Sequence, residues 1–80
     1  MPGQQNLASG PILPKEVSNQ LIALYNQGKL EHLINQVSGL TNKYPNSIML
    51  WNLLGAANAD LSRSKEAISA FKTAILLNPD

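Results

Sequence analysis

The strongest constraint on the fold of this chain is an internal repeat of 34 residues. Pro45 and Pro79 are 34 residues apart, and the same shift places Gly28 on Ser62. Four apolar pairs also coincide under this shift: Leu33 with Ala67, Ile34 with Ile68, Val37 with Phe71, and Leu40 with Ala74. Self-similarity at such a period indicates stacked units that bury their apolar faces against one another. We therefore expect two copies of one unit, residues 14–47 and 48–80.

Each unit has the pattern of two helices joined by a turn. In the first unit, Pro14 suits a first helical turn, and apolar residues at spacings of three and four continue to Gly28. A second helix should run from Leu30 to Tyr44, because Pro45 cannot continue it.

The second unit repeats this organisation. Asn46 or Ser47 can cap a third helix, residues 62–64 break it, and a fourth helix should end at Asn78 and Pro79. No stretch alternates with a period of two over the length of a strand. The predicted fold class is all-α, with four helices in tandem helix–turn–helix repeats, preceded by a flexible arm over residues 1–13.

Composition excludes several classes of function. Six basic and five acidic residues are scattered along the chain, so no basic stripe favours nucleic acid or an anionic membrane. The absence of cysteine removes disulfides, thiol nucleophiles and thiolate metal sites. Neither a signal peptide nor an apolar run of membrane-spanning length is visible, and a cytoplasmic location is expected by default.

Gly55 is an unusual residue for a helix interior, where glycine costs about 1 kcal/mol relative to alanine. It indicates that another backbone must come close to the helix at this position. Together with its neighbours it belongs to a set at fixed spacing: Trp51, Leu54, Gly55, Ala67, Phe71, Ala74 and Pro79. This set resembles the signature of the tetratricopeptide repeat. One signature position departs from the family pattern, because Asn58 stands where the family prefers an aromatic residue, and the first repeat is degenerate.

The resemblance implies a role for each of these residues. The seven residues of the signature would form the structural core, with Gly55 against Ala67 and with Trp51, Leu54 and Phe71 filling the space beside them. The first helices of the two repeats would line a concave surface for a peptide or partner segment. That surface would carry Ser18, Asn19, Ile22, Tyr25, Asn26, Met49, Asn52, Leu53, Ala56 and Asp60. The alternative is that these are ordinary surface residues or the contact face for a neighbouring repeat.

Two known binding modes of the family fit poorly. The subfamily that grips C-terminal carboxylates uses cations on the concave surface, whereas the corresponding positions here are Ser18, Ile22 and Leu53. The asparagine ladder of another subfamily is possible only in weakened form, because Leu53 stands at the preferred position and Asn52 beside it.

Residues suited to catalysis are sparse. His32 is the only histidine and is expected on a solvated helix face, and the five acidic residues form no close pair in the sequence. The turn at residues 62–65 lacks the glycines of a phosphate loop. We therefore predict no catalysis, no metal and no cofactor. Asn58 is interpreted as a polar residue near the surface, the alternative being a buried amide that requires partners.

The predicted function is a protein-interaction or assembly module without catalytic activity. The alternative is an N-terminal fragment of a larger enzyme, because ALYNQGKL and WNLLGAA resemble the N-terminal repeats of bacterial glycosyltransferase- or sulfotransferase-like proteins. We also expect self-association, since about three repeats are usually needed for a stable stack. Copies could stack end to end or exchange helices, and the sequence does not choose between these two arrangements.

Overall fold

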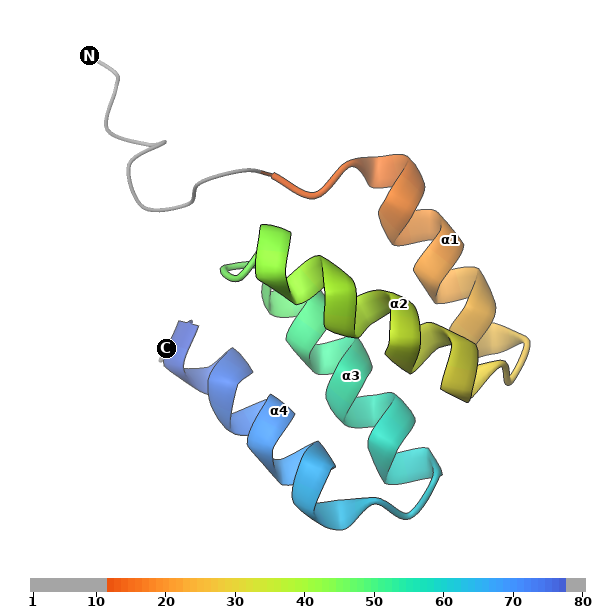
Figure 1. Cartoon of the computed structure of the whole chain (residues 1–80), viewed down its shortest axis with the longest axis vertical. Coiled ribbons are helices and arrows are strands. Elements are labelled where there is room, and N and C mark those ends of the chain that lie inside the picture. Colours follow the sequence, from red (N-terminus) through yellow and green to blue (C-terminus); the bar gives the residue numbers. More distant parts are fainter. Residues whose placement is uncertain (1–11, 78–80) are drawn as a thin grey trace.

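The computed structural model describes residues 12–77, which form four α-helices in sequence (Figure 1). These are α1 (Lys15–Asn26), α2 (Leu30–Lys43), α3 (Ile48–Asp60) and α4 (Ser64–Leu77). The described chain contains no strand, so the all-α prediction is confirmed. Pro14 is the N-cap of α1, and the Ser47 hydroxyl caps α3 by accepting a hydrogen bond from Leu50 N at 3.5 Å. Most of the arm expected over residues 1–13, and Pro79, lie outside the described residues.

The repeat is visible in the backbone geometry of the two interhelical turns. Gly28 and Ser62 both have positive φ, 75° and 63°. In the first turn the N–H of Gly28 donates to Tyr25 O at 3.0 Å and the N–H of Lys29 donates to Leu24 O at 2.9 Å. In the second turn the N–H of Ser62 donates to Ala59 O at 3.0 Å and the N–H of Arg63 donates to Asn58 O at 2.8 Å. Donors and acceptors in the two turns all differ by 34, as expected for two copies of one unit.

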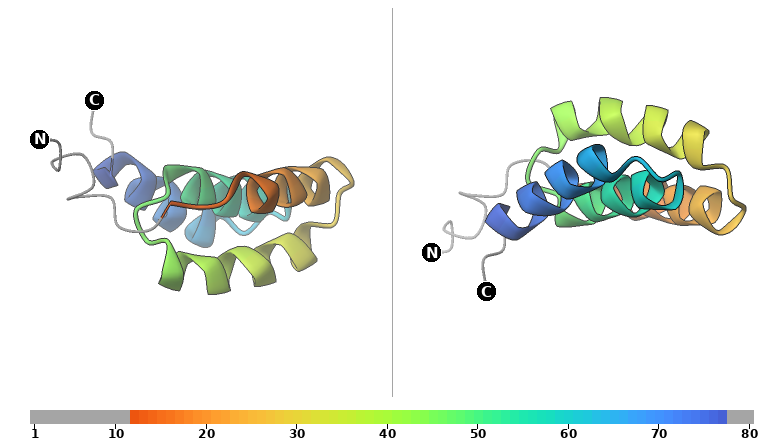
Figure 2. Two further views of the ribbon diagram at one scale, coloured as in Figure 1. Left: turned by 90° about the horizontal axis from the view of Figure 1, so that it is seen from above. Right: turned by 90° about the horizontal axis from the view of Figure 1, so that it is seen from below.

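Helix α3 is the centre of the arrangement, because it packs against each of the other three helices. Helix α2 crosses one side of α3, and Figure 2 shows α2 set apart from α1 and α3. Helix α4 runs beside α3 and packs against no other helix within residues 12–77. The described chain therefore has one edge at α1 and a second edge at α4.

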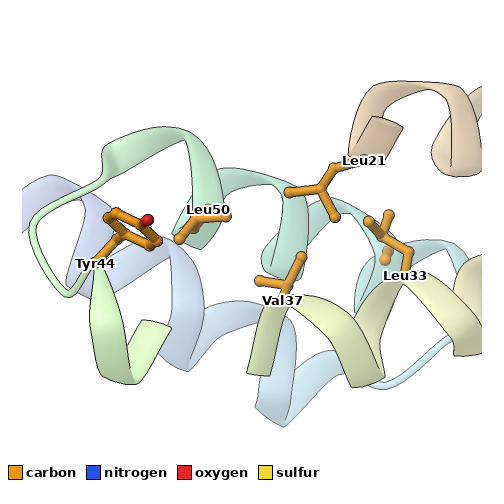
Figure 3. Packing of buried hydrophobic residues seen from close by; sticks show 6 residues of the cluster. Leu21, Leu33, Val37, Tyr44 and Leu50 are labelled. Carbon is orange, nitrogen blue, oxygen red and sulfur yellow. The ribbon is translucent and has the colours of Figure 1, made fainter. Parts of the chain in front are cut away.

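The main hydrophobic core lies between α1, α2 and α3 (Figure 3). Its buried members are Leu21, Leu33, Val37, Tyr44, Leu50 and Ala57. Leu50 and Tyr44 lie close together at one end, whereas Leu21 and Leu33 lie close together at the other. None of the buried members comes from α4, so that helix does not belong to this core.

The contact between α3 and α4 is built from small residues. Gly55 of α3 is buried, and so are Ala67, Ala70 and Ala74 of α4. A Cβ atom added to Gly55 would lie 2.7 Å from Cε1 of the Phe71 ring, well inside van der Waals distance. The nearest atoms to this position all belong to the Phe71 side chain, so the group that approaches Gly55 is an aromatic ring and not the backbone at Ala67 that the sequence predicted.

Three of the residues predicted to be core are less buried than expected. Phe71 is 37% exposed, because one side of α4 has no neighbour in the described chain. Trp51 is half-buried, and its indole N–H donates to Pro45 O at 2.9 Å. Leu54 is also half-buried. Phe71 and Trp51 thus border the surface, and the fully buried side chains are mainly leucine and valine.

Candidate functional site

The residues predicted to line a concave surface come from α1 and α3, which pack side by side. We call this set the α1–α3 face, with members Ser18, Asn19, Ile22, Tyr25, Asn26, Met49, Asn52, Leu53, Ala56 and Asp60. Five members are exposed: Asn19, Ile22, Asn26, Asn52 and Asp60. The other five are half-buried, and Leu53 and Tyr25 pack against the main core. Leu53 is therefore partly a structural residue, and the freely accessible groups are mostly side-chain amides.

A hydrogen bond joins the two helices of this face. The Tyr25 hydroxyl of α1 donates to Asp60 Oδ2 of α3 at 2.8 Å. This bond to the carboxylate raises the pKa of Tyr25 above its ordinary value, and both burial and the negative charge of Asp60 act in the same direction. The phenol therefore stays protonated at neutral pH and remains a donor.

A separate groove of about 540 Å³ lies between α2 and α4, with α3 as its floor. We call it the α2–α4 groove. Helix α2 contributes Ile34 and Ser38 to its lining, and α3 contributes Trp51 and Leu54. The opposite wall is lined by Arg63, Lys65, Glu66, Ser69 and Ala70. Sequence analysis did not predict this groove, because it depends on the separation of α2 from α4.

Asn58 lies in the lining of the α2–α4 groove, and its position corrects the interpretation of this residue as a surface amide. It is only 4% exposed, and its Nδ2 donates to Leu54 O at 2.9 Å. Within residues 12–77 no buried polar side-chain atom lacks a hydrogen-bond partner. Asn58 is thus a satisfied buried amide one turn away from Leu54, rather than a solvated group.

Residues with catalytic potential are dispersed in the structure. His32 is exposed, and its Nε2 lies 2.9 Å from Nε2 of Gln36 one turn along α2. In residues 12–77 no group of three or more histidine, aspartate or glutamate side chains could hold a metal ion. Arg63 forms an ion pair with Glu31, which ties the turn after α3 to the start of α2. The turn at residues 62–65 therefore has a structural contact of its own.

Comparison of the chain with protein-family models, curated proteins and solved structures finds no match. The resemblance to the tetratricopeptide repeat therefore depends on the quoted residues and on the 34-residue repeat itself. None of the helices in residues 12–77 combines the length and the apolar character needed to cross a membrane.

Proposed function

We propose that the protein is a non-catalytic interaction module of tetratricopeptide type, which binds an extended segment of a partner protein on the α1–α3 face. The observation that carries this proposal is the Tyr25–Asp60 hydrogen bond, which links α1 to α3 across this face at 2.8 Å. A rigid pair of helices can present side chains in a constant geometry, which lowers the entropic cost of binding. A cytoplasmic location belongs to the same proposal.

The exposed groups of the α1–α3 face indicate what kind of segment it would bind. Asn19, Asn26 and Asn52 each offer a donor and an acceptor, which match the peptide groups of an extended backbone. Ile22 is 41% exposed and offers an apolar contact beside them. Asp60 accepts a hydrogen bond from Tyr25 and is the one charged residue among the members of this face. We therefore expect recognition mainly of backbone and apolar groups, with a single negative charge at Asp60.

The α2–α4 groove is a second candidate surface for the same function. Its volume of about 540 Å³ falls within the range of small-ligand pockets, and Trp51 and Leu54 give it an apolar floor. Such a groove would take one or two apolar side chains of a peptide.

The test is a selection of peptides from a random library on the immobilised protein, followed by binding measurements with two variants. Asn52→Arg obstructs the α1–α3 face, and Ser69→Arg obstructs the α2–α4 groove. Both residues are exposed, so both variants should fold like the parent, which melting curves would verify. Loss of binding in Asn52→Arg alone would support the α1–α3 face. Loss in Ser69→Arg alone would assign the binding site to the groove, and binding retained in both would contradict the proposal.

A further inference from the structure

Helix α4 lies at one edge of the described chain (Figure 1), and it carries a row of exposed apolar side chains. We call this row the α4 stripe, with members Ile68, Phe71 and Ile75, which are 56%, 37% and 63% exposed. Their spacing of three and four residues places them on one side of the helix. The stripe is on a different surface from the α1–α3 face, and none of its three residues lines the α2–α4 groove, although the nearby Lys65 does. A role for the stripe therefore does not depend on binding at the α1–α3 face.

The internal repeat shows how such a stripe is covered. Under the 34-residue shift, Ile68, Phe71 and Ile75 correspond to Ile34, Val37 and Thr41 of α2. Val37 is fully buried in the core that α2 shares with α3, and the other two are half-buried. The molecule therefore contains one filled and one open version of the same interface. In the filled version the covering element is an apolar helix, α3, which contributes Leu50 and Ala57 to the core.

Charge beside the interface differs between the two versions. In the filled version Glu31 of α2 pairs with Arg63, which follows α3. The residue of α4 that corresponds to Glu31 is Lys65, of opposite sign. Lys72 lies seven residues further on, about two turns away on the same side of α4, and both lysines are exposed. A helix that covers the α4 stripe should therefore carry an acidic residue where the filled version has Arg63.

A second copy of this chain does not meet these requirements. If copies stacked end to end, α1 of the next copy would take the place that α3 has on α2. The residues of α1 that correspond to Leu50, Leu54 and Ala57 are Glu16, Gln20 and Ala23. Lys29 would take the place of Arg63, and its positive charge would repel the positive charge of Lys65. End-to-end self-association, which stays a prediction, would lose apolar contact and bring two like charges together.

Two other modes of self-association also fail to place an apolar helix with an acidic residue over the α4 stripe. Exchange of helices between two copies would rebuild the contacts of the monomer and leave both α4 stripes open. Two α4 helices packed face to face would bring Lys65 and Lys72 of both copies to one interface, without an acidic residue on the same side of the helix. A helix from another protein can combine the apolar and the acidic groups.

We propose that the α4 stripe is the docking site for an amphipathic helix of another protein, which has an α3-like apolar face and an acidic residue beyond its last turn that meets Lys65. Binding of this kind places the apolar face of one helix against a complementary apolar surface, while flanking charges set orientation and specificity.

The probe for this proposal is a fluorescein-labelled peptide of residues 46–63, which reproduces α3, together with the same peptide carrying Arg63→Glu. We expect the Arg63→Glu peptide to bind the protein about fivefold more tightly, because a repulsion becomes an attraction at an exposed site. The preference should reverse in the protein variant Lys65→Glu and shrink at high salt. Fluorescence anisotropy measures all of these affinities.

A second pair of variants tests the location. Ile75→Ser should weaken binding of the Arg63→Glu peptide at least about tenfold, since a buried apolar contact is lost. Ile12→Ser is the matched control, because Ile12 is 82% exposed and lies outside the proposed surfaces. It should leave the affinity unchanged. Melting curves would verify that both variants are folded.

Four results would overturn the proposal. The first is that neither peptide binds at millimolar concentration. The second is that both peptides bind equally well to the parent and to Lys65→Glu. The third is that Ile75→Ser binds the Arg63→Glu peptide like the parent. The fourth is a stable dimer of the free protein, seen by light scattering, that Ile75→Ser converts to a monomer, because a second copy would then be the occupant.

Discussion

Gly28 and Ser62, which are equivalent residues of the two repeats, share a left-handed backbone conformation, with φ of 75° and 63°. Each residue follows the last turn of a helix, and its N–H donates to a carbonyl of that turn at 3.0 Å. Glycine adopts this conformation without strain, whereas a residue with a side chain does so at a cost of roughly 1–2 kcal/mol. The second turn therefore carries a strain that the first does not.

This difference gives a prediction with opposite signs at the two positions. Ser62→Gly should stabilise the protein by about 0.5–1 kcal/mol, after the greater freedom of glycine in the unfolded chain is subtracted. Gly28→Ala should destabilise it by about 1 kcal/mol, and because no atom lies within 4 Å of the added Cβ, the cost is conformational rather than steric. Urea denaturation measures both changes. Equal effects of the same sign would contradict the equivalence of the two turns.

The contact between Gly55 and Phe71 is best tested by a double-mutant cycle. Gly55→Ala should destabilise the protein by about 1 kcal/mol, because overpacking against the Phe71 ring outweighs the better helix propensity of alanine. In a Phe71→Ala background the ring is absent, and the same Gly55→Ala change should stabilise by up to about 1 kcal/mol. The free energies of unfolding of the four proteins close the cycle. A Gly55→Ala effect that is independent of residue 71 would show that the ring does not fill this space.

The exposure of Phe71 sets the expected cost of removing its side chain. Complete burial would give a loss of about 3–5 kcal/mol for Phe71→Ala. Because 37% of the residue is exposed, we expect a smaller loss of about 2 kcal/mol. Leu50, which is fully buried, is the comparison, and Leu50→Ala should cost about 2–5 kcal/mol. Thermal or urea unfolding should rank Leu50→Ala as the more damaging change, and the opposite ranking would contradict the burial described above.

The Tyr25–Asp60 bond predicts a dependence of stability on alkaline pH. The pKa of Tyr25 is raised in the folded state, chiefly by the hydrogen bond to Asp60, from an ordinary value of 10.0. Because a raised pKa means that the folded state holds the proton more tightly, its contribution to stability is complete below pH 10 and is lost as pH rises through the folded-state pKa.

Tyr25→Phe should remove this part of the alkaline loss of stability. Asp60→Asn should return the pKa of Tyr25 toward its ordinary value, since the carboxylate is the main cause of the shift. The measurements are urea denaturation between pH 8 and pH 11, at intervals of about half a unit, and an NMR titration of the Tyr25 ring. An unchanged Tyr25 titration in Asp60→Asn would show that the hydrogen bond is absent in solution.

The helix boundaries could be predicted from the sequence because single residues encode them. Pro14 and Pro45 each fix φ and lack a backbone N–H, and Gly28 adopts the positive φ of the turn without strain, so their effect is local and does not depend on distant contacts. The 34-residue shift then predicted the corresponding boundaries in the second repeat, where Ser62 stands in place of the turn glycine.

Burial was harder to predict, because it depends on the number of neighbours that each helix has. Helix α3 contains apolar residues on all sides and contacts three helices, so periodicity alone did not single out Leu50 as fully buried. Phe71 has the spacing of a core residue, yet no helix in residues 12–77 covers its outer side. Asn58 and the α2–α4 groove were missed for a related reason, since both depend on how far α2 lies from α4.

Attachment of α4 through α3 alone has a consequence for cooperativity. The main core joins α1, α2 and α3, whereas the α3–α4 contact buries glycine and alanine, which remove little apolar surface from water. We therefore expect α4 to open as a separate foldon while the core of α1, α2 and α3 stays intact. Its amide hydrogens would exchange with solvent through this partial opening, while those at the centre of α2 and α3 would exchange only on global unfolding. A ligand on the outer side of α4 would slow the first process and leave the second less affected, which couples recognition to the order in which the chain unfolds.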